Sequence, residues 1–159
     1  MWPDHWPTIT RQIATATVSA LDAVRSESAP AFDAAVGDLV ALPYEQVTAV
    51  YAGMTRELLE ELHPDGLTGE DVQAVLERSV RGGARWQSSL HPDAVVEVLV
   101  ETLGVSDPDA ETPKIRPEQY LSAGSVVLAE LVAARRVAPE PYVRRAVAEI
   151  ERAETMEMP

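Results

Sequence analysis

The feature that most constrains the fold is a run of apolar residues spaced three and four apart through residues 43–81. This spacing places them on one face of an α-helix. A turn at residues 63–67, containing Pro64 and Gly66, divides the run into two segments, because Pro fixes φ and Gly accepts positive φ. We therefore expect a helical hairpin, 43–62 and 68–81, against which the rest of the chain packs.

Local signals mark both ends of the second segment. Thr68 and Asp71 have the spacing of a capping box, in which two side chains satisfy free N–H groups at a helix start. Gly82 and Gly83 follow the last apolar position, and glycine commonly ends a helix. These signals predict that the second helix of the hairpin stops before Gly82.

The same spacing continues through most of the remaining chain. It predicts further helices at about 7–26, 28–42, 92–103, 117–136 and 141–153, with a short helix or turn at 84–90. The sequence thus predicts an all-α protein, a single compact helical bundle of about six to seven helices over residues 1–159. An irregular N-terminal arm, 1–7, a loop at 105–116 and a frayed tail, 154–159, complete the chain.

Residues 92–103 fit either a strand or a helix. Val96, Val98 and Val100 alternate as in a strand, and β-branched residues favour one. Pro92 at the start, Gly104 at the end and the length of the segment favour a helix. We expect a helix, and its broad apolar face predicts the most buried element of the bundle.

Composition excludes several classes of protein. A net charge of −13 argues against a nucleic-acid partner, because a phosphate backbone would be repelled. The absence of cysteine removes disulfides and thiolate metal sites, which fits a cytoplasmic location. We see no signal peptide and no apolar run of membrane-spanning length, so no membrane partner is expected. No cofactor motif and no catalytic motif is present.

Acidic residues crowd the end of segment 43–62. Glu57, Glu60, Glu61 and Asp65 lie where a helix dipole disfavours anions. They form either a solvated rim or, less favoured, a metal site, since hard cations bind converging carboxylates. Glu57-x-x-Glu60-Glu61 is similar to the acidic helix of all-helical nucleotide pyrophosphohydrolases, but the second acidic pair of those enzymes, Glu-x-x-Asp, is missing. We therefore do not retain that resemblance, and a metal-dependent enzyme that uses the acidic hairpin ranks as the third hypothesis.

Basic residues gather around the turn at 139–141. Arg135, Arg136, Arg144 and Arg145 flank it and could form a spot opposite the acidic hairpin end. They form either solvated helix faces with intrahelical pairs or a docking patch for an acidic partner. The first hypothesis is consequently a non-enzymatic acidic protein that acts through protein–protein contacts, possibly as a homodimer.

Two further features leave alternatives open. Trp2 and Trp6 in the arm either fold back onto the bundle, which we favour, or mark a partner surface. Gly124 interrupts segment 117–136 where another backbone or a ligand comes close, and packing is favoured. The second hypothesis is a small-molecule-binding bundle, with a pocket formed by Tyr51, Met54, Tyr120 and Gly124.

Overall fold

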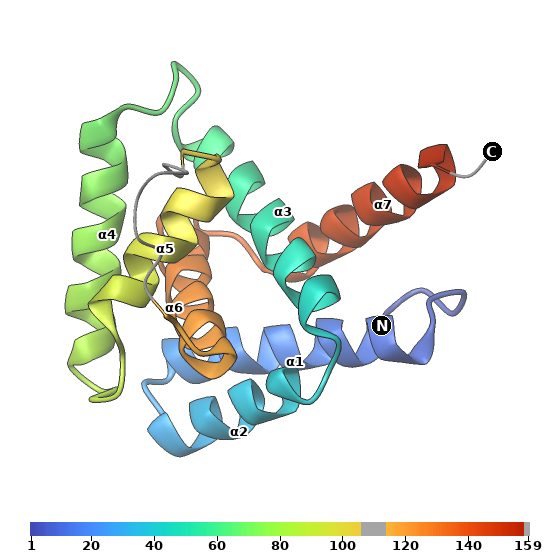
Figure 1. Ribbon diagram of the computed structural model, residues 1–159, viewed down its shortest axis with the longest axis horizontal. Helices are drawn as coiled ribbons and strands as arrows, with labels where there is room; N and C mark the ends of the chain where they lie inside the picture. The colour runs from blue at the N-terminus through green and yellow to red at the C-terminus, as the bar shows by residue number, and fades with distance from the viewer. Residues whose placement is uncertain (106–113, 158–159) are drawn as a thin grey trace.

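The computed structural model describes residues 1–105 and 114–157, which form seven helices and no strand (Figure 1). The predicted all-α class is therefore confirmed. The helices are α1 (Thr8–Arg25), α2 (Ala29–Val40), α3 (Tyr44–Leu62), α4 (Gly69–Ala84), α5 (Pro92–Leu103), α6 (Pro117–Arg135) and α7 (Glu140–Glu157). Most of the predicted loop at 105–116 lies outside the described residues.

Capping explains where several helices begin and end. At the start of α4, the Thr68 hydroxyl accepts from the Asp71 amide at 3.1 Å, and the Asp71 carboxylate accepts from the Thr68 amide at 2.9 Å. This reciprocal pair satisfies two N–H groups that a helix start leaves free. Gly104 ends α5 in the left-handed region, with φ of 67°. Both ends agree with the sequence signals.

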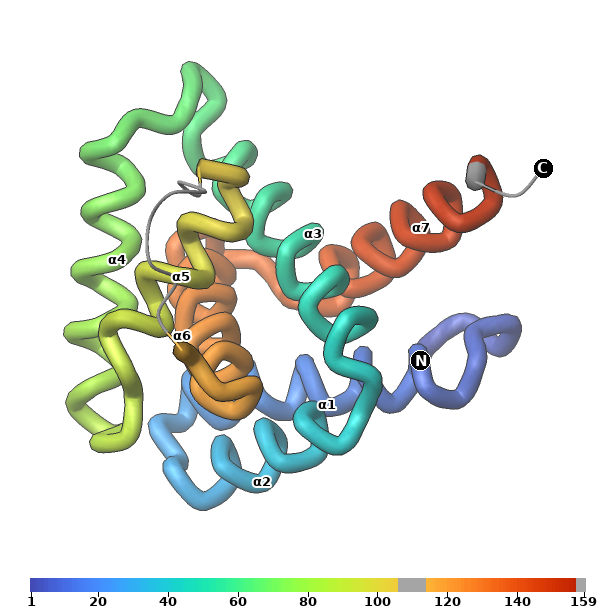
Figure 2. Tube along the Cα trace, in the orientation of Figure 1, coloured from blue at the N-terminus to red at the C-terminus, as the bar shows by residue number. Residues whose placement is uncertain are grey.

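Helix α6 lies at the centre of the fold. It packs against α1, α2, α3, α4 and α5, whereas α7 rests mainly on α3 (Figure 2). Eight of its residues are buried and they point in all directions around the helix, so α6 lacks the single polar face of a surface helix. We had expected residues 92–103 to be the most buried element, and that expectation is wrong: Val96 of α5 is 41% exposed.

The predicted hairpin is also wrong. Helices α3 and α4 follow each other in the chain but do not pack as a pair, because α4 lies against α5 and α6 (Figure 1). Their apolar stripes are buried, but against α6 rather than against each other. The turn between them carries α4 to the opposite side of the molecule from α7.

Two helices are longer than predicted. Helix α4 continues through Gly82 and Gly83 to Ala84, because Gly83 is needed for close packing and not for a left-handed turn. A Cβ at Gly83 would lie 2.5 Å from Leu90 Cδ2 and 3.2 Å from Val126 Cγ1. Helix α7 reaches Glu157, so residues 154–157 are helical rather than part of a frayed tail.

The irregular arm at residues 1–7 folds back onto the bundle. Trp6 is buried, and the Trp2 ring stacks on it with a centroid distance of 5.7 Å. The Trp2 indole N–H donates to Thr15 Oγ1 at 3.1 Å. The arm therefore follows the favoured alternative, since stacking covers two large apolar rings.

Candidate functional site

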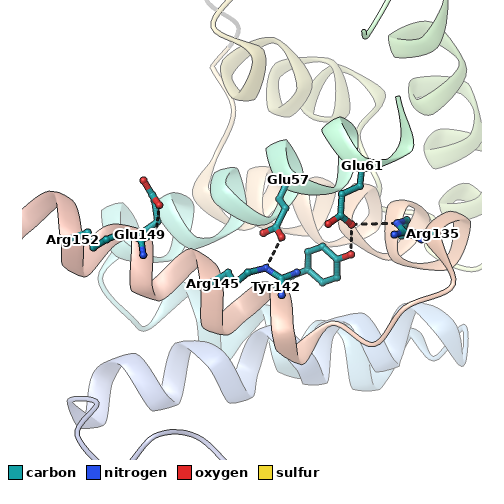
Figure 3. Close-up of polar contacts among 7 residues, drawn as sticks. All are labelled: Glu57, Glu61, Arg135, Tyr142, Arg145, Glu149 and Arg152. Atoms are coloured by element: carbon teal, nitrogen blue, oxygen red, sulfur yellow. Dashed lines mark hydrogen bonds and ion pairs between the residues drawn. The ribbon is translucent and has the colours of Figure 1, made fainter. Parts of the chain in front are cut away.

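The four arginines of the predicted docking patch do not act together. Arg135 and Arg145 reach across to α3, where Arg135 Nε lies 3.3 Å from Glu61 Oε1 and Arg145 Nε lies 2.5 Å from Glu57 Oε1 (Figure 3). The Tyr142 hydroxyl also donates to Glu61, and the Arg145 guanidinium lies 4.6 Å from the centre of the Tyr142 ring. The basic spot thus pairs with acids of the same chain.

The other two arginines face elsewhere. Arg144 donates to the Met1 carbonyl at 3.1 Å, and its guanidinium lies 5.4 Å from the centre of the Trp2 ring, so it holds the N-terminal arm. Arg136 ends α6 in a left-handed conformation. The four side chains therefore have three separate environments and form no common patch.

These contacts also account for the acids at the end of α3. Glu57 and Glu61 are offset by arginines from α7 and α6, which outweighs the unfavourable dipole of a helix C-terminus (Figure 3). Glu60 and Asp65 do not join them: within residues 1–105 and 114–157, no group of three or more potential ligands could hold a metal ion. The candidate metal residues are dispersed.

Three of the four residues predicted to line a ligand pocket are packed in the core. Met54 is fully buried, and a Cβ at Gly124 would stand 2.9 Å from Tyr51 Cδ2, so the Tyr51 ring fills the space that the glycine leaves. The Tyr51 hydroxyl lies 2.8 Å from Ser125 Oγ, which in turn donates to the Leu121 carbonyl. Burial raises the pKa of Tyr51 to about 12, although the hydroxyls of Ser125 and Thr17 act in the opposite direction.

Tyr120 lies apart from that group. Its ring meets Tyr44 edge-on, with centroids 6.3 Å apart, near Glu101 of α5. Burial and the nearby Glu101 carboxylate raise the pKa of Tyr120, because both disfavour a phenolate. The predicted pocket residues consequently do not converge on one cavity.

The structure instead contains a groove that the sequence did not reveal. It lies among the last turns of α1, the last two turns of α4, the C-terminal half of α6 and the segment that leads into α7, and it encloses about 630 Å³. Its apolar lining includes Val24, Trp86, Val126, Ala129 and Val132. We call it the α1–α4–α6 groove.

Charged side chains at the groove are mostly paired. Arg78 Nε lies 3.0 Å from Glu130 Oε1, linking α4 to α6, and Arg85 pairs with Glu27. A third, intrahelical pair joins Arg25 to Asp22 at 3.4 Å. Two charged residues of the lining, Arg136 and Glu140, have no such partner among the described residues.

Ser79 is a groove residue whose buried hydroxyl lacks a hydrogen bond among the described residues. It is 1% exposed, and within residues 1–105 and 114–157 its hydroxyl has no hydrogen-bond partner, not even a carbonyl of its own helix. One turn further along α4, Gly82 also lines the groove, and a Cβ there would have no atom within 4 Å. Ser79 therefore offers an unused hydroxyl beside a place where α4 has no side chain.

Backbone strain coincides with this groove. Among the described residues, only Glu27 and Arg136 combine a side chain with positive φ, at 54° and 58°, and both belong to the groove lining. Both residues follow the end of a helix, and the next amide in each case, Ser28 or Val137, donates to a carbonyl five residues earlier, at 3.0 Å and 3.3 Å. The left-handed backbone therefore closes α1 and α6 beside the groove, at a cost of order 1 kcal/mol relative to glycine.

Sequence reasoning missed the groove because its residues come from three separate helices. The one local signal was Gly82-Gly83, which we interpreted as a helix end. A search of protein families, a search of curated proteins and a search of solved structures each found no match for this chain. Among the described residues, no helix combines the length and apolar character needed to cross a membrane.

Proposed function

We propose that this protein is a non-enzymatic binding protein that holds a small, mainly apolar molecule in the α1–α4–α6 groove. The proposal keeps the small-molecule hypothesis but moves it away from Tyr51, Met54, Tyr120 and Gly124. A volume of about 630 Å³ falls within the usual range for ligand sites. Its lining combines apolar residues such as Val24, Trp86 and Val126 with charged residues that are mostly paired with one another.

The observation that carries the proposal is the Ser79 hydroxyl. A buried hydroxyl without a partner costs about 1–3 kcal/mol of folding free energy, and a structural role gives no reason to keep it. Because the Ser79 Oγ has almost no accessible surface, a bound molecule would hydrogen-bond to it only after a small shift of the groove wall. A ligand would then give this serine the partner that it lacks.

Gly82 supports the same interpretation. A glycine within a helix costs roughly 1 kcal/mol relative to alanine, and no neighbour here requires its small size. Gly83, by contrast, is needed by Leu90 and Val126. The missing side chain at Gly82 leaves the groove wider than any other residue at this position would.

The protein–protein hypothesis relied on unpaired arginines, and the metal hypothesis relied on unpaired acids. The arginines expected to bind a partner pair with Glu57 and Glu61 of the same chain, and those two acids are therefore not free for a metal. Self-association stays a prediction that sedimentation tests.

The test is binding of the uncharged dye N-phenylnaphthylamine, whose fluorescence rises in apolar sites. We expect saturable binding at one site per chain, with a change in Trp86 emission because Trp86 lines the groove. Gly82→Leu places a side chain into the open space and should abolish dye binding while the protein stays folded. Gly37→Leu is the matched control, since Gly37 also lies within a helix with nothing near its Cβ position but outside this groove.

Two results would contradict the proposal. One is an absence of saturable dye binding to the folded wild-type protein. The other is equal dye binding by the Gly82→Leu and Gly37→Leu variants when both have wild-type circular dichroism. Ser79→Ala adds a further check: it should increase stability and weaken binding of ligands that carry a hydrogen-bonding group.

A further inference from the structure

We infer that the molecule bound in the α1–α4–α6 groove carries an anionic group, a carboxylate, and that Arg136 recognises it. This inference rests on the proposed function, because it concerns the ligand of the same groove. Its basis is the distribution of charge and strain around the groove.

The charges of the lining leave one arginine available. Four arginines and four acids line the groove, so their formal charges cancel in a chain whose net charge is −13. The groove is therefore a place where an anion meets less repulsion than over the acidic remainder of the surface. Arg25, Arg78 and Arg85 are each paired with an acid, which leaves Arg136.

Arg136 closes α6 through its backbone and not through its side chain, because the left-handed turn lets the Val137 amide donate to the Val132 carbonyl at 3.3 Å. It occupies the cap of α6 with φ of 58° and ψ of 50°, a position and conformation in which glycine is the usual residue. Glu27, the other strained residue with a side chain, uses that side chain to bind Arg85. Arg136 has no ion pair or hydrogen bond from its side chain within the described residues, so the chain gains nothing from an arginine there.

Helix dipoles do not explain Arg136 either. A cation near the last turn of α6 is favourable, but Arg135 already provides one from within the helix. The unpaired acid of the lining, Glu140, has a structural explanation, since it lies in the first turn of α7, where free N–H groups favour an anion. A ligand with an anionic group would therefore give Arg136 a partner, whereas Glu140 already has a favourable position at the start of α7.

A guanidinium suits a carboxylate in particular. Its planar set of N–H donors matches the two carboxylate oxygens, and such charge-assisted pairs are about twice as strong as neutral hydrogen bonds. An apolar body would lie along Val126, Val132 and Trp86, with its carboxylate at the Arg136 end of the groove. The expected ligand is an amphipathic monocarboxylate.

The experiment compares three displacing molecules of equal chain length, namely decanoate, decanol and decylamine, each below its micelle concentration. Each displaces N-phenylnaphthylamine from the wild-type protein and from the Arg136→Gln and Glu140→Gln variants. We expect decanoate to bind wild-type protein about tenfold more tightly than decanol, and decylamine more weakly than either. Arg136→Gln should remove the preference for decanoate without changing the affinity for decanol.

Glu140→Gln is the matched control, because it also removes one charge from the same rim. It should leave the preference for decanoate intact or increase it. Arg136→Gly guards against misfolding of the glutamine variant: glycine suits the left-handed cap, so this variant should be at least as stable as wild type and still lose the preference.

The outcomes separate this inference from the proposed function. Equal affinity for decanoate and decanol, with dye binding intact, overturns the carboxylate and leaves the groove a binding site. A preference for decylamine that Glu140→Gln removes also overturns it, in favour of a cationic ligand. Failure of the dye itself to bind overturns the proposed function and this inference together.

Discussion

The substitution Gly124→Ala tests why the central helix α6 contains a glycine. A Cβ at this position would lie 2.9 Å from Cδ2 and 3.4 Å from Cε2 of the Tyr51 ring, whereas carbon atoms prefer about 3.5–4.0 Å. The ring has little freedom to move away, because its hydroxyl is held at 2.8 Å from Ser125 Oγ in the core. We therefore expect alanine to overpack this contact.

The expected magnitude combines two opposing terms. Overpacking a core typically costs about 1–3 kcal/mol. Replacing a helical glycine by alanine contributes up to about 1 kcal/mol of stability through helix propensity. The net effect of Gly124→Ala is then roughly 0–2 kcal/mol of destabilisation, which is too close to zero to interpret alone.

Gly37→Ala isolates the packing term. Gly37 lies within α2 and has nothing within 4 Å of its Cβ position, so alanine there should stabilise by about 0.5–1 kcal/mol. The two variants should differ by about 1–3 kcal/mol in urea denaturation followed by circular dichroism. For a chain of this length, the difference corresponds to roughly 2–12 °C in Tm.

A third variant identifies the ring as the cause. In a Tyr51→Leu background the ring is absent, so adding Gly124→Ala should stabilise about as much as Gly37→Ala does. The reasoning is refuted if Gly124→Ala and Gly37→Ala have the same effect in the wild-type chain. It is also refuted if the penalty at Gly124 persists after Tyr51 is replaced.

Three electrostatic predictions concern other parts of the molecule. Hydrogen bonds from Thr68 lower the pKa of Asp71. The ionised Asp71 carboxylate therefore stabilises the folded protein above pH about 4, and this stabilisation is lost as pH falls through the folded-state pKa. An Asp71→Asn variant should show a flatter acid denaturation profile. Burial is the main cause of a raised pKa at Glu97, and the neighbouring Glu101 adds to it, so ionising Glu97 opposes folding. Glu97→Gln should therefore increase the free energy of unfolding near neutral pH, and this increase should vanish in acid. A double-mutant cycle of Glu57→Gln and Arg145→Gln should give a coupling of about 1 kcal/mol or less, because Arg145 is half-exposed, and a much larger value would contradict this.

The sequence was sufficient to predict the helical class and most helix ends. Periodicity identifies which face of a helix is buried, and caps such as Thr68–Asp71 mark its start. Periodicity does not say which neighbour covers that face, so α3 and α4 were wrongly paired with each other. For α6 the apolar stripe itself is misleading, since a helix buried on all sides has no single stripe.

The groove could not be predicted from the sequence, for a related reason. Ser79, Gly82 and Arg136 are separated by up to 57 positions along the chain and meet only through the packing of α4 on α6. Nothing in the sequence near Arg136 shows that its backbone is left-handed. The pair Gly82-Gly83 reads equally well as a helix end, and only the packing of α4 shows that the helix continues through it.

Among the four arginines that line the groove, Arg136 differs from the other three. Arg78, Arg85, Arg135 and Arg145 each reach an acid on a different helix or connecting segment, and such pairs favour the rigid, multi-donor guanidinium over lysine. Four of the twelve arginines of the chain follow this pattern, and it accounts for the acids they meet. Arg136 has the same chemistry and lines a groove where three other arginines are paired, yet no acid in the described chain meets it. Since pairing is the rule for arginines in this groove, the acid missing at Arg136 is best supplied from outside the chain.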